Sequence, residues 1–202
     1  MNTNAPIYMD YLFIMDSLRQ YASPKAKLTS MIKSGEIVKV KRGIYINPGN
    51  SAVSLKTLAN KIYGPSYISF EYALSFYGLI PERVQTVTSA SMGKNKSKLF
   101  QSPVGAFSYQ SISPAVYPYG VTRIEENGSP FLIASKEKAL CDLLSKSGKS
   151  TNINSLTKLL YDDYRIDREA ILLFNINEVE FLAPMYRKKA IALLPKLLKK
   201  GG

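Results

Sequence analysis

Few residues of this chain could carry out covalent or acid–base chemistry. It has 202 residues, a single cysteine and no histidine. Catalytic triads, Cys–His pairs and His-containing zinc sites all need an imidazole, so the composition excludes them. An acid followed two residues later by a lysine, the spacing of metal-dependent nuclease cores, does not occur, and neither does a GxxxxGK[ST] or GxGxxG loop. The sequence therefore predicts no enzyme activity, no cofactor and no bound metal.

The remaining candidates for chemistry are one thiol and a group of carboxylates. Cys141 lies in an apolar stripe, which favours a buried, unreactive thiol over a nucleophile. Asp162, Asp163 and Asp167 fall at an expected helix end and loop, where capping and solubility explain them better than metal binding. A lone cysteine fits a reducing cytoplasm, and no apolar run reaches the length of a signal peptide or a membrane span. We expect a cytoplasmic protein with no membrane partner.

Basic charge is the strongest functional signal in the composition. Lysine and arginine number 27 against 15 acidic residues, for a net charge of +12 and a pI near 9.6. This charge predicts attraction to a polyanion, either a nucleic acid or an anionic membrane surface. It is concentrated at the two ends, because residues 1–50 carry seven basic and three acidic side chains, and the tail from 183 carries six and none.

The basic N-terminal segment has the order helix, turn, helix, hairpin. Residues 7–21 have a helical apolar period, and Ser23-Pro24 begins a second helix that Gly35 ends. Residues 36–41 then alternate, Arg42-Gly43 makes a turn, and 43–49 return as a second strand. Gly43 suits this turn because it tolerates a positive φ. This order is typical of a winged helix-turn-helix, whose second helix enters the major groove while its wing contacts flanking phosphates.

Both elements that would face DNA carry suitable side chains. They are Lys25, Lys27, Thr29, Ser30 and Lys33 on the helix, and Lys39, Lys41 and Arg42 on the wing. Lysines mostly supply phosphate contacts, so base recognition would fall to Lys25, Lys27, Thr29 or Ser30 near the start of the helix. The alternative is that these are ordinary solvated lysines of a small helical subdomain; charge, element order and element length together favour DNA binding.

The rest of the chain mixes strands and helices, so we expect an α+β (mixed α/β) fold with domains 1–50 and 51–202. We expect a hairpin at 120–134 around Asn127-Gly128 and a capped helix from Ser135. Lys136, Glu137 and Lys138 are expected in a solvated first turn of that helix. The other expected strands are 85–90 and pieces of 98–112, and the other expected helices are 54–63, 69–77, 154–161, 167–174 and 179–200, with a polar linker at 148–154.

The helix expected at 179–200 is basic and amphipathic. It could extend a DNA footprint, touch an anionic membrane or contact tRNA held by a partner. A packed terminal helix with a basic solvent face explains the same pattern, and Pro195 argues against one continuous helix on a membrane. A packed terminal helix with a basic solvent face is favoured over any of these specific roles.

Three segments resemble AbiE-type antitoxins of type IV toxin–antitoxin systems. They are LTSMIKSGEIVKVKRGIYINP (28–48), which is similar to the family's winged-helix end, YISFEYALSFYGLIPERVQTVTSA (67–90) and FLIASKEKALCDLL (131–144). The resemblance implies an antitoxin that represses its own operon by binding promoter DNA, at inverted repeats. It also implies neutralisation of a nucleotidyltransferase-like toxin without a stable complex. The DNA-contact positions that it matches add Ser23 and Tyr45 to the residues above.

One departure from the family pattern concerns the segment before Pro24. The usual three-helix core is compressed there to about twenty residues, so the first helix would be a stub. Two alternatives to the antitoxin hypothesis stay open: a stand-alone winged-helix transcriptional regulator, and an RNA-directed or toxin-modifying accessory enzyme.

Overall fold

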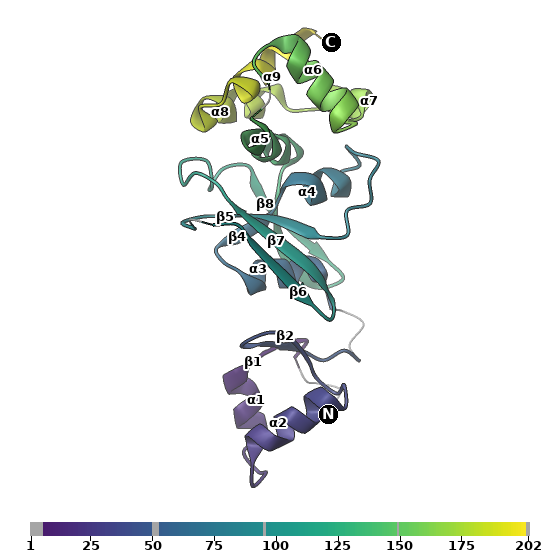
Figure 1. Cartoon of the computed structure of the whole chain (residues 1–202), viewed down its shortest axis with the longest axis vertical. Helices are drawn as coiled ribbons and strands as arrows, with labels where there is room; N and C mark the ends of the chain where they lie inside the picture. Colours follow the sequence, from purple (N-terminus) through teal and green to yellow (C-terminus); the bar gives the residue numbers. More distant parts are fainter. Residues whose placement is uncertain (1–5, 50–52, 95, 149, 201–202) are drawn as a thin grey trace.

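The computed structural model describes residues 6–49, 53–94, 96–148 and 150–200, and it has the mixed α+β fold expected from the sequence. A small N-terminal unit lies at one end of an elongated molecule, and a larger unit of sheet and helices makes up the rest (Figure 1). The expected domain boundary at residue 50 lies outside the described residues.

The N-terminal unit has two helices against a three-stranded antiparallel sheet of order β1-β3-β2. Its elements are β1 (Tyr8–Asp10), α1 (Tyr11–Ser17), α2 (Pro24–Lys33), β2 (Val38–Lys41) and β3 (Ile44–Ile46). The helix expected over 7–21 was therefore wrong at its start, because Tyr8 and Met9 pair with Ile46 and Tyr45 of β3. The Asp10 side chain accepts the Phe13 amide at 2.7 Å and begins the helix only there.

A separate apolar core holds the N-terminal unit together. The buried stripes of α1 and α2 meet one face of the sheet, and this core contains Met9, Ile14, Leu18, Leu28, Met31, Ile37 and Tyr45. The opposite face of the sheet contacts the larger unit, since Val40 and Ile46 belong to the core of that unit. The hairpin therefore lies between α1 and α2 on one side and the larger unit on the other (Figure 1).

The larger unit is built on a six-stranded sheet of order β6-β7-β5-β4-β9-β8. The strands are β4 (Ser66–Ile68), β5 (Val87–Ser91), β6 (Lys98–Ser102), β7 (Gly105–Ser111), β8 (Val121–Glu126) and β9 (Ser129–Ala134). Helix α3 (Leu55–Ile62) lies on one face, where the Tyr109 hydroxyl donates to the Ala59 carbonyl at 2.6 Å. The other face is covered by α4 (Phe70–Phe76) and α5 (Lys136–Ser147). The hairpin expected at 120–134 is confirmed as β8–β9, with Asn127 and Gly128 at positive φ.

A helical layer lies beyond α5, at the end of the molecule away from the N-terminal unit (Figure 1). It contains α6 (Ile153–Lys158), a π-helical turn η1 (Leu159–Asp163), α7 (Arg168–Leu172), α8 (Ile176–Tyr186) and α9 (Lys189–Lys200). The single helix expected over 179–200 is wrong, because Arg187 adopts a left-handed φ of 51° and separates α8 from α9. Within the described part of the chain, none of the helices has the length and apolar character needed to cross a bilayer.

Candidate nucleic-acid interface

Helix α2 presents a polar and basic stripe to solvent. Lys25, Thr29 and Lys33 recur every four residues and are exposed, with Ser30 beside them. The opposite side of the helix buries Leu28 in the small core. The Thr29 hydroxyl donates to the Lys25 carbonyl at 2.9 Å, so its oxygen is left to accept a hydrogen bond. The structure thus brings four of the predicted helix residues onto one face.

Two more predicted residues lie at the start of α2. Ser23 is the N-cap residue of α2, and its carbonyl accepts the Lys27 amide at 3.0 Å. The Ser23 side chain is exposed and makes no capping hydrogen bond to α2, so its hydroxyl is available to a ligand. Lys27 is half-buried, with its ammonium 5.3 Å from the centre of the Tyr21 ring. Lys27 is therefore set apart from the exposed stripe.

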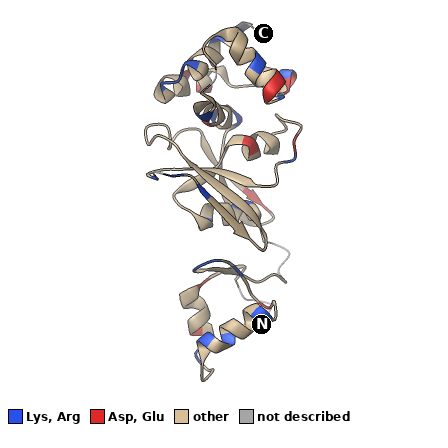
Figure 2. Ribbon diagram, viewed as in Figure 1, with Lys and Arg blue, Asp and Glu red and all other residues tan. Residues whose placement is uncertain are grey.

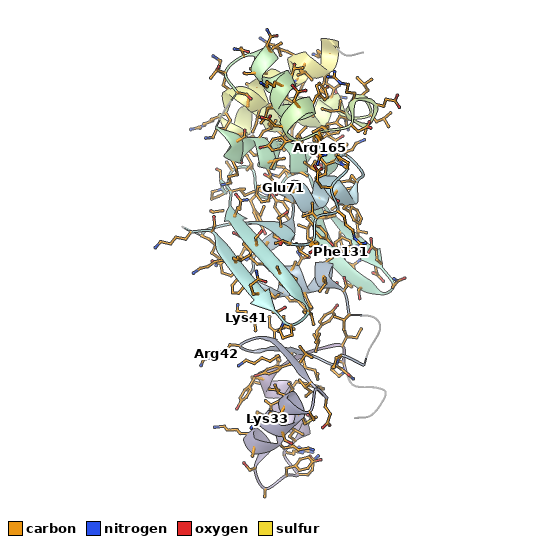
Figure 3. The ribbon with its side chains drawn as sticks, turned by 45° about the vertical axis from the view of Figure 1, so that its right-hand side comes forward. Lys33, Lys41, Arg42, Glu71, Phe131 and Arg165 are labelled. Atoms are coloured by element: carbon orange, nitrogen blue, oxygen red, sulfur yellow. The ribbon has the colours of Figure 1, made fainter. Side chains whose placement is uncertain are left out.

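The hairpin carries the remaining predicted positions, and two of the four are exposed to solvent. Lys39 and Arg42 are exposed, and Arg42 precedes Gly43, whose φ of 83° makes the turn. Figure 3 labels Arg42 at the hairpin turn and Lys33 on α2. Figure 2 shows basic residues, in blue, along α2 and the hairpin, with few acidic residues between them. An exposed helix face and a basic turn are the elements that contact a groove and its phosphates.

Lys41 and Tyr45 point elsewhere, so neither belongs to this surface. The Lys41 ammonium donates to the Ile62 carbonyl at 2.8 Å and lies 5.1 Å from the centre of the Phe100 ring. It therefore joins the hairpin to the larger unit. Tyr45 is only 5% exposed and packs in the small core. Successive side chains of strand β3 point to opposite faces of the sheet, and both faces are covered. Strand β1, which the sequence analysis did not predict, pairs with β3 at Tyr45.

A second cluster of functional groups was missed by sequence reasoning. Lys138 and Asp142, on α5, are fully buried and form an ion pair at 3.0 Å. Asp142 also accepts hydrogen bonds from the hydroxyls of Tyr67, Ser69 and Tyr186 at 3.0, 2.7 and 2.6 Å. The expectation of a solvated first turn over 136–138 is wrong for Glu137 and Lys138, which are buried, whereas Lys136 is half-buried. Every oxygen of the Asp142 carboxylate is hydrogen-bonded, which is the arrangement of a structural polar network.

The pKa values of several groups in and beside this network are shifted. Burial, reinforced by the charge of Asp142, raises the pKa of Tyr67 and of Tyr186. Burial lowers the pKa of Lys138, while Asp142 opposes that shift. Burial also raises the pKa of Cys141, which is fully buried. The thiol is thus held protonated, as expected for an unreactive cysteine.

Asp162, Asp163 and Asp167 were expected at a helix end and loop, and one of the three, Asp167, caps a helix. The Asp167 side chain accepts the Ala170 amide at 2.7 Å and begins α7. Among the described residues, no three cysteine or acidic side chains come together in a way that could hold a metal ion.

Alkaline pH is expected to destabilise the protein because of the buried hydroxyls and the thiol. In the unfolded chain tyrosine titrates near pH 10 and cysteine near pH 8.5, whereas their folded pKa values are raised. The stability that these groups contribute is complete below the unfolded pKa and is lost as pH rises, by about 1.4 kcal/mol per unit for each group. Lys138 and Lys146, whose pKa values burial lowers, act in the opposite direction, but they are outnumbered by the tyrosines and the thiol whose pKa values are raised. Urea unfolding at several pH values should give a free energy that falls above about pH 9; a flat or rising profile would contradict this.

Comparison with known proteins supports the fold alone. A scan against protein-family models gives no match, and a search of curated proteins gives none. Among solved structures, the chain is similar to the crystal structure of the RV2827C protein from Mycobacterium tuberculosis. The TM-score is 0.62 at 12% sequence identity, over 98% of this chain and 73% of that one. The two chains therefore share an architecture.

Proposed function

We propose that the chain is a DNA-binding antitoxin that represses its own operon and neutralises a nucleotidyltransferase-like toxin. One observation carries the DNA-binding half of this proposal: the exposed stripe of Lys25, Thr29 and Lys33 on α2, in a unit whose hairpin turn carries the exposed Arg42. The order β1-α1-α2-β2-β3, with β1 pairing to β3, supports a winged helix-turn-helix whose first helix is missing. Helix α2 would be its recognition helix.

The position of α2 supports this role. It lies at the end of the molecule farthest from the C-terminal helices, so a duplex can approach it without meeting the larger unit (Figure 1). The side of the sheet that faces the larger unit is already occupied through Val40, Ile46 and Lys41. We therefore assign the DNA contacts to Ser23, Lys25, Thr29, Ser30 and Lys33, with Lys39 and Arg42 on phosphates, and leave Lys27, Lys41 and Tyr45 out.

The antitoxin half of the proposal rests on the resemblance of the three quoted segments. Two of them, 67–90 and 131–144, include strands and helices that surround the buried Lys138–Asp142 network. The test is co-expression with a nucleotidyltransferase-like protein encoded by a neighbouring gene. Growth arrest by that protein should be relieved by the wild-type chain and also by a Lys25→Gln/Lys33→Gln/Arg42→Gln variant. If the wild-type chain gives no relief, the antitoxin half is wrong.

A stand-alone transcriptional regulator is the second candidate. The same stripe on α2 favours it, because DNA binding needs no toxin. The two candidates differ in one result: a regulator binds upstream DNA but leaves toxin-induced growth arrest unchanged. An enzymatic role has less support, since the buried Lys138 and Asp142 have no exposed surface through which a substrate could reach them.

A further inference from the structure

A cavity of about 520 Å³ lies in the larger unit, between the β7–β8 loop and the end of α8. Its volume is within the ~300 to 1,000 Å³ range of small-molecule sites. Helix α8 belongs to the C-terminal layer, at the opposite end of the molecule from α2 (Figure 1). The residues that line the cavity are Ser113, Ala115, Pro184, Met185, Tyr186 and Arg187.

The lining combines an apolar wall with two polar groups. Pro184, Met185 and the ring of Tyr186 supply the wall, and such surfaces accept a planar ring. The Ser113 hydroxyl accepts the Ala115 amide at 3.3 Å, so its own proton can be donated to a ligand. Arg187 is exposed at the end of α8 and presents a guanidinium, which suits a phosphate through paired hydrogen bonds.

Further positive charge gathers beside the cavity. Lys188 follows Arg187, and the Lys146 ammonium donates to the carbonyl of Ser111, two residues before Ser113. Burial lowers the pKa of Lys146, and the charge of Lys188 lowers it further. Asp142 is the acid that opposes this shift, and its carboxylate is already engaged by Lys138 and three hydroxyls.

We propose that this cavity binds a mononucleotide, with its phosphates at Arg187, Lys188 and Lys146 and its base against the wall of Pro184 to Tyr186. The site is independent of the proposed DNA surface, and the inference needs neither DNA binding nor a toxin to be correct. It also gives the basic C-terminal segment a specific ligand, where the sequence favoured an ordinary solvated face.

The test is isothermal titration of the full chain with ATP, adenosine and inorganic pyrophosphate. Saturable binding of ATP at one site per chain is expected. Adenosine should bind more weakly because it lacks the phosphates, and pyrophosphate should bind more weakly because it lacks the base. Arg187→Asn should weaken ATP binding by at least about tenfold, the loss of one charge-assisted hydrogen bond. Asparagine tolerates the left-handed backbone of this position, so the fold is kept. Lys188→Gln, on an exposed side chain, is a second variant with the same expected direction.

Two matched controls remove the same charge elsewhere. Lys196→Gln changes an exposed residue of α9, and Lys33→Gln changes the proposed DNA surface. Both should leave ATP affinity within about twofold of wild type, a difference too small for a lost direct contact. The proposal is overturned by absence of saturable ATP binding up to about 1 mM. It is also overturned if pyrophosphate binds as tightly as ATP, or if a control variant weakens binding as much as Arg187→Asn.

Discussion

Replacing Asp142 by alanine is expected to lower the free energy of unfolding by about 3–5 kcal/mol, the cost of leaving a buried partner charge uncompensated. Lys138 would keep its ammonium in a fully buried position with only the Tyr186 hydroxyl, 2.6 Å away, as a hydrogen-bond acceptor. The hydroxyls of Tyr67 and Ser69 would lose their acceptor as well. Since natural domains are stable by only about 5–15 kcal/mol, this one change should bring the larger unit close to unfolding.

A paired variant separates the charge from the packing. Lys138→Met/Asp142→Leu removes both charges and keeps similar volumes, so it should recover much of the stability that Asp142→Ala loses. Cys141→Ala, at the neighbouring buried position, is the matched control for making a small cavity without changing charge. Urea unfolding of the three variants gives the free energies. If Asp142→Ala costs no more than Cys141→Ala, the network does not hold the sheet and the helical layer together.

Removing three basic groups from the proposed DNA surface is expected to weaken binding by on the order of 100-fold at ~0.1 M salt, if each contacts one phosphate. The variant is Lys25→Gln/Lys33→Gln/Arg42→Gln, all at exposed positions. Each lost contact should also make the slope of log K against log salt shallower by about 0.9, and three contacts by about 2.7. Exposed positions away from the core change stability little, so the thermal unfolding midpoint should stay close to wild type.

Two control variants sharpen this prediction. Lys196→Gln removes one charge at the opposite end of the molecule and should leave the slope unchanged. Lys41→Met removes a charge that the sequence placed on the wing but that the structure engages with Ile62. It should therefore change the slope by much less than Arg42→Gln does. If the slope becomes equally shallow for Lys41→Met and Arg42→Gln, Lys41 contacts phosphate as Arg42 does. Leaving Lys41 out of the DNA surface would then be wrong.

Local sequence signals predicted most of the elements, because their causes lie within a few residues. Pro24 and Gly35 bound α2, and Asn127-Gly128 makes the β8–β9 turn. Strand β1 was missed because its partner β3 is more than thirty residues away, and three paired residues leave no alternating run of their own. The break at Arg187 was missed because an arginine at positive φ carries no glycine-like signal.

The candidate site was predicted only in its exposed part. The sequence named Lys25, Thr29 and Lys33 as basic and polar side chains of the expected helix, and their spacing of four residues places them on one face. The burial of Tyr45 and the contact of Lys41 depend on what packs against the hairpin, which charge patterns do not reveal. One signal could have exposed the Lys138–Asp142 pair: the helix 136–147 has apolar residues on more than one side, and a helix that is apolar nearly all round is buried.

The most direct measurement is a salt titration of binding to the DNA upstream of the chain's own gene, beside a scrambled duplex of equal length. We expect tighter binding to the upstream DNA, with a steep slope that the Lys25→Gln/Lys33→Gln/Arg42→Gln variant flattens by about 2.7. Equal affinity for the two duplexes, or a slope unchanged in the variant, would contradict the assignment of α2 and Arg42 as the operator-binding surface.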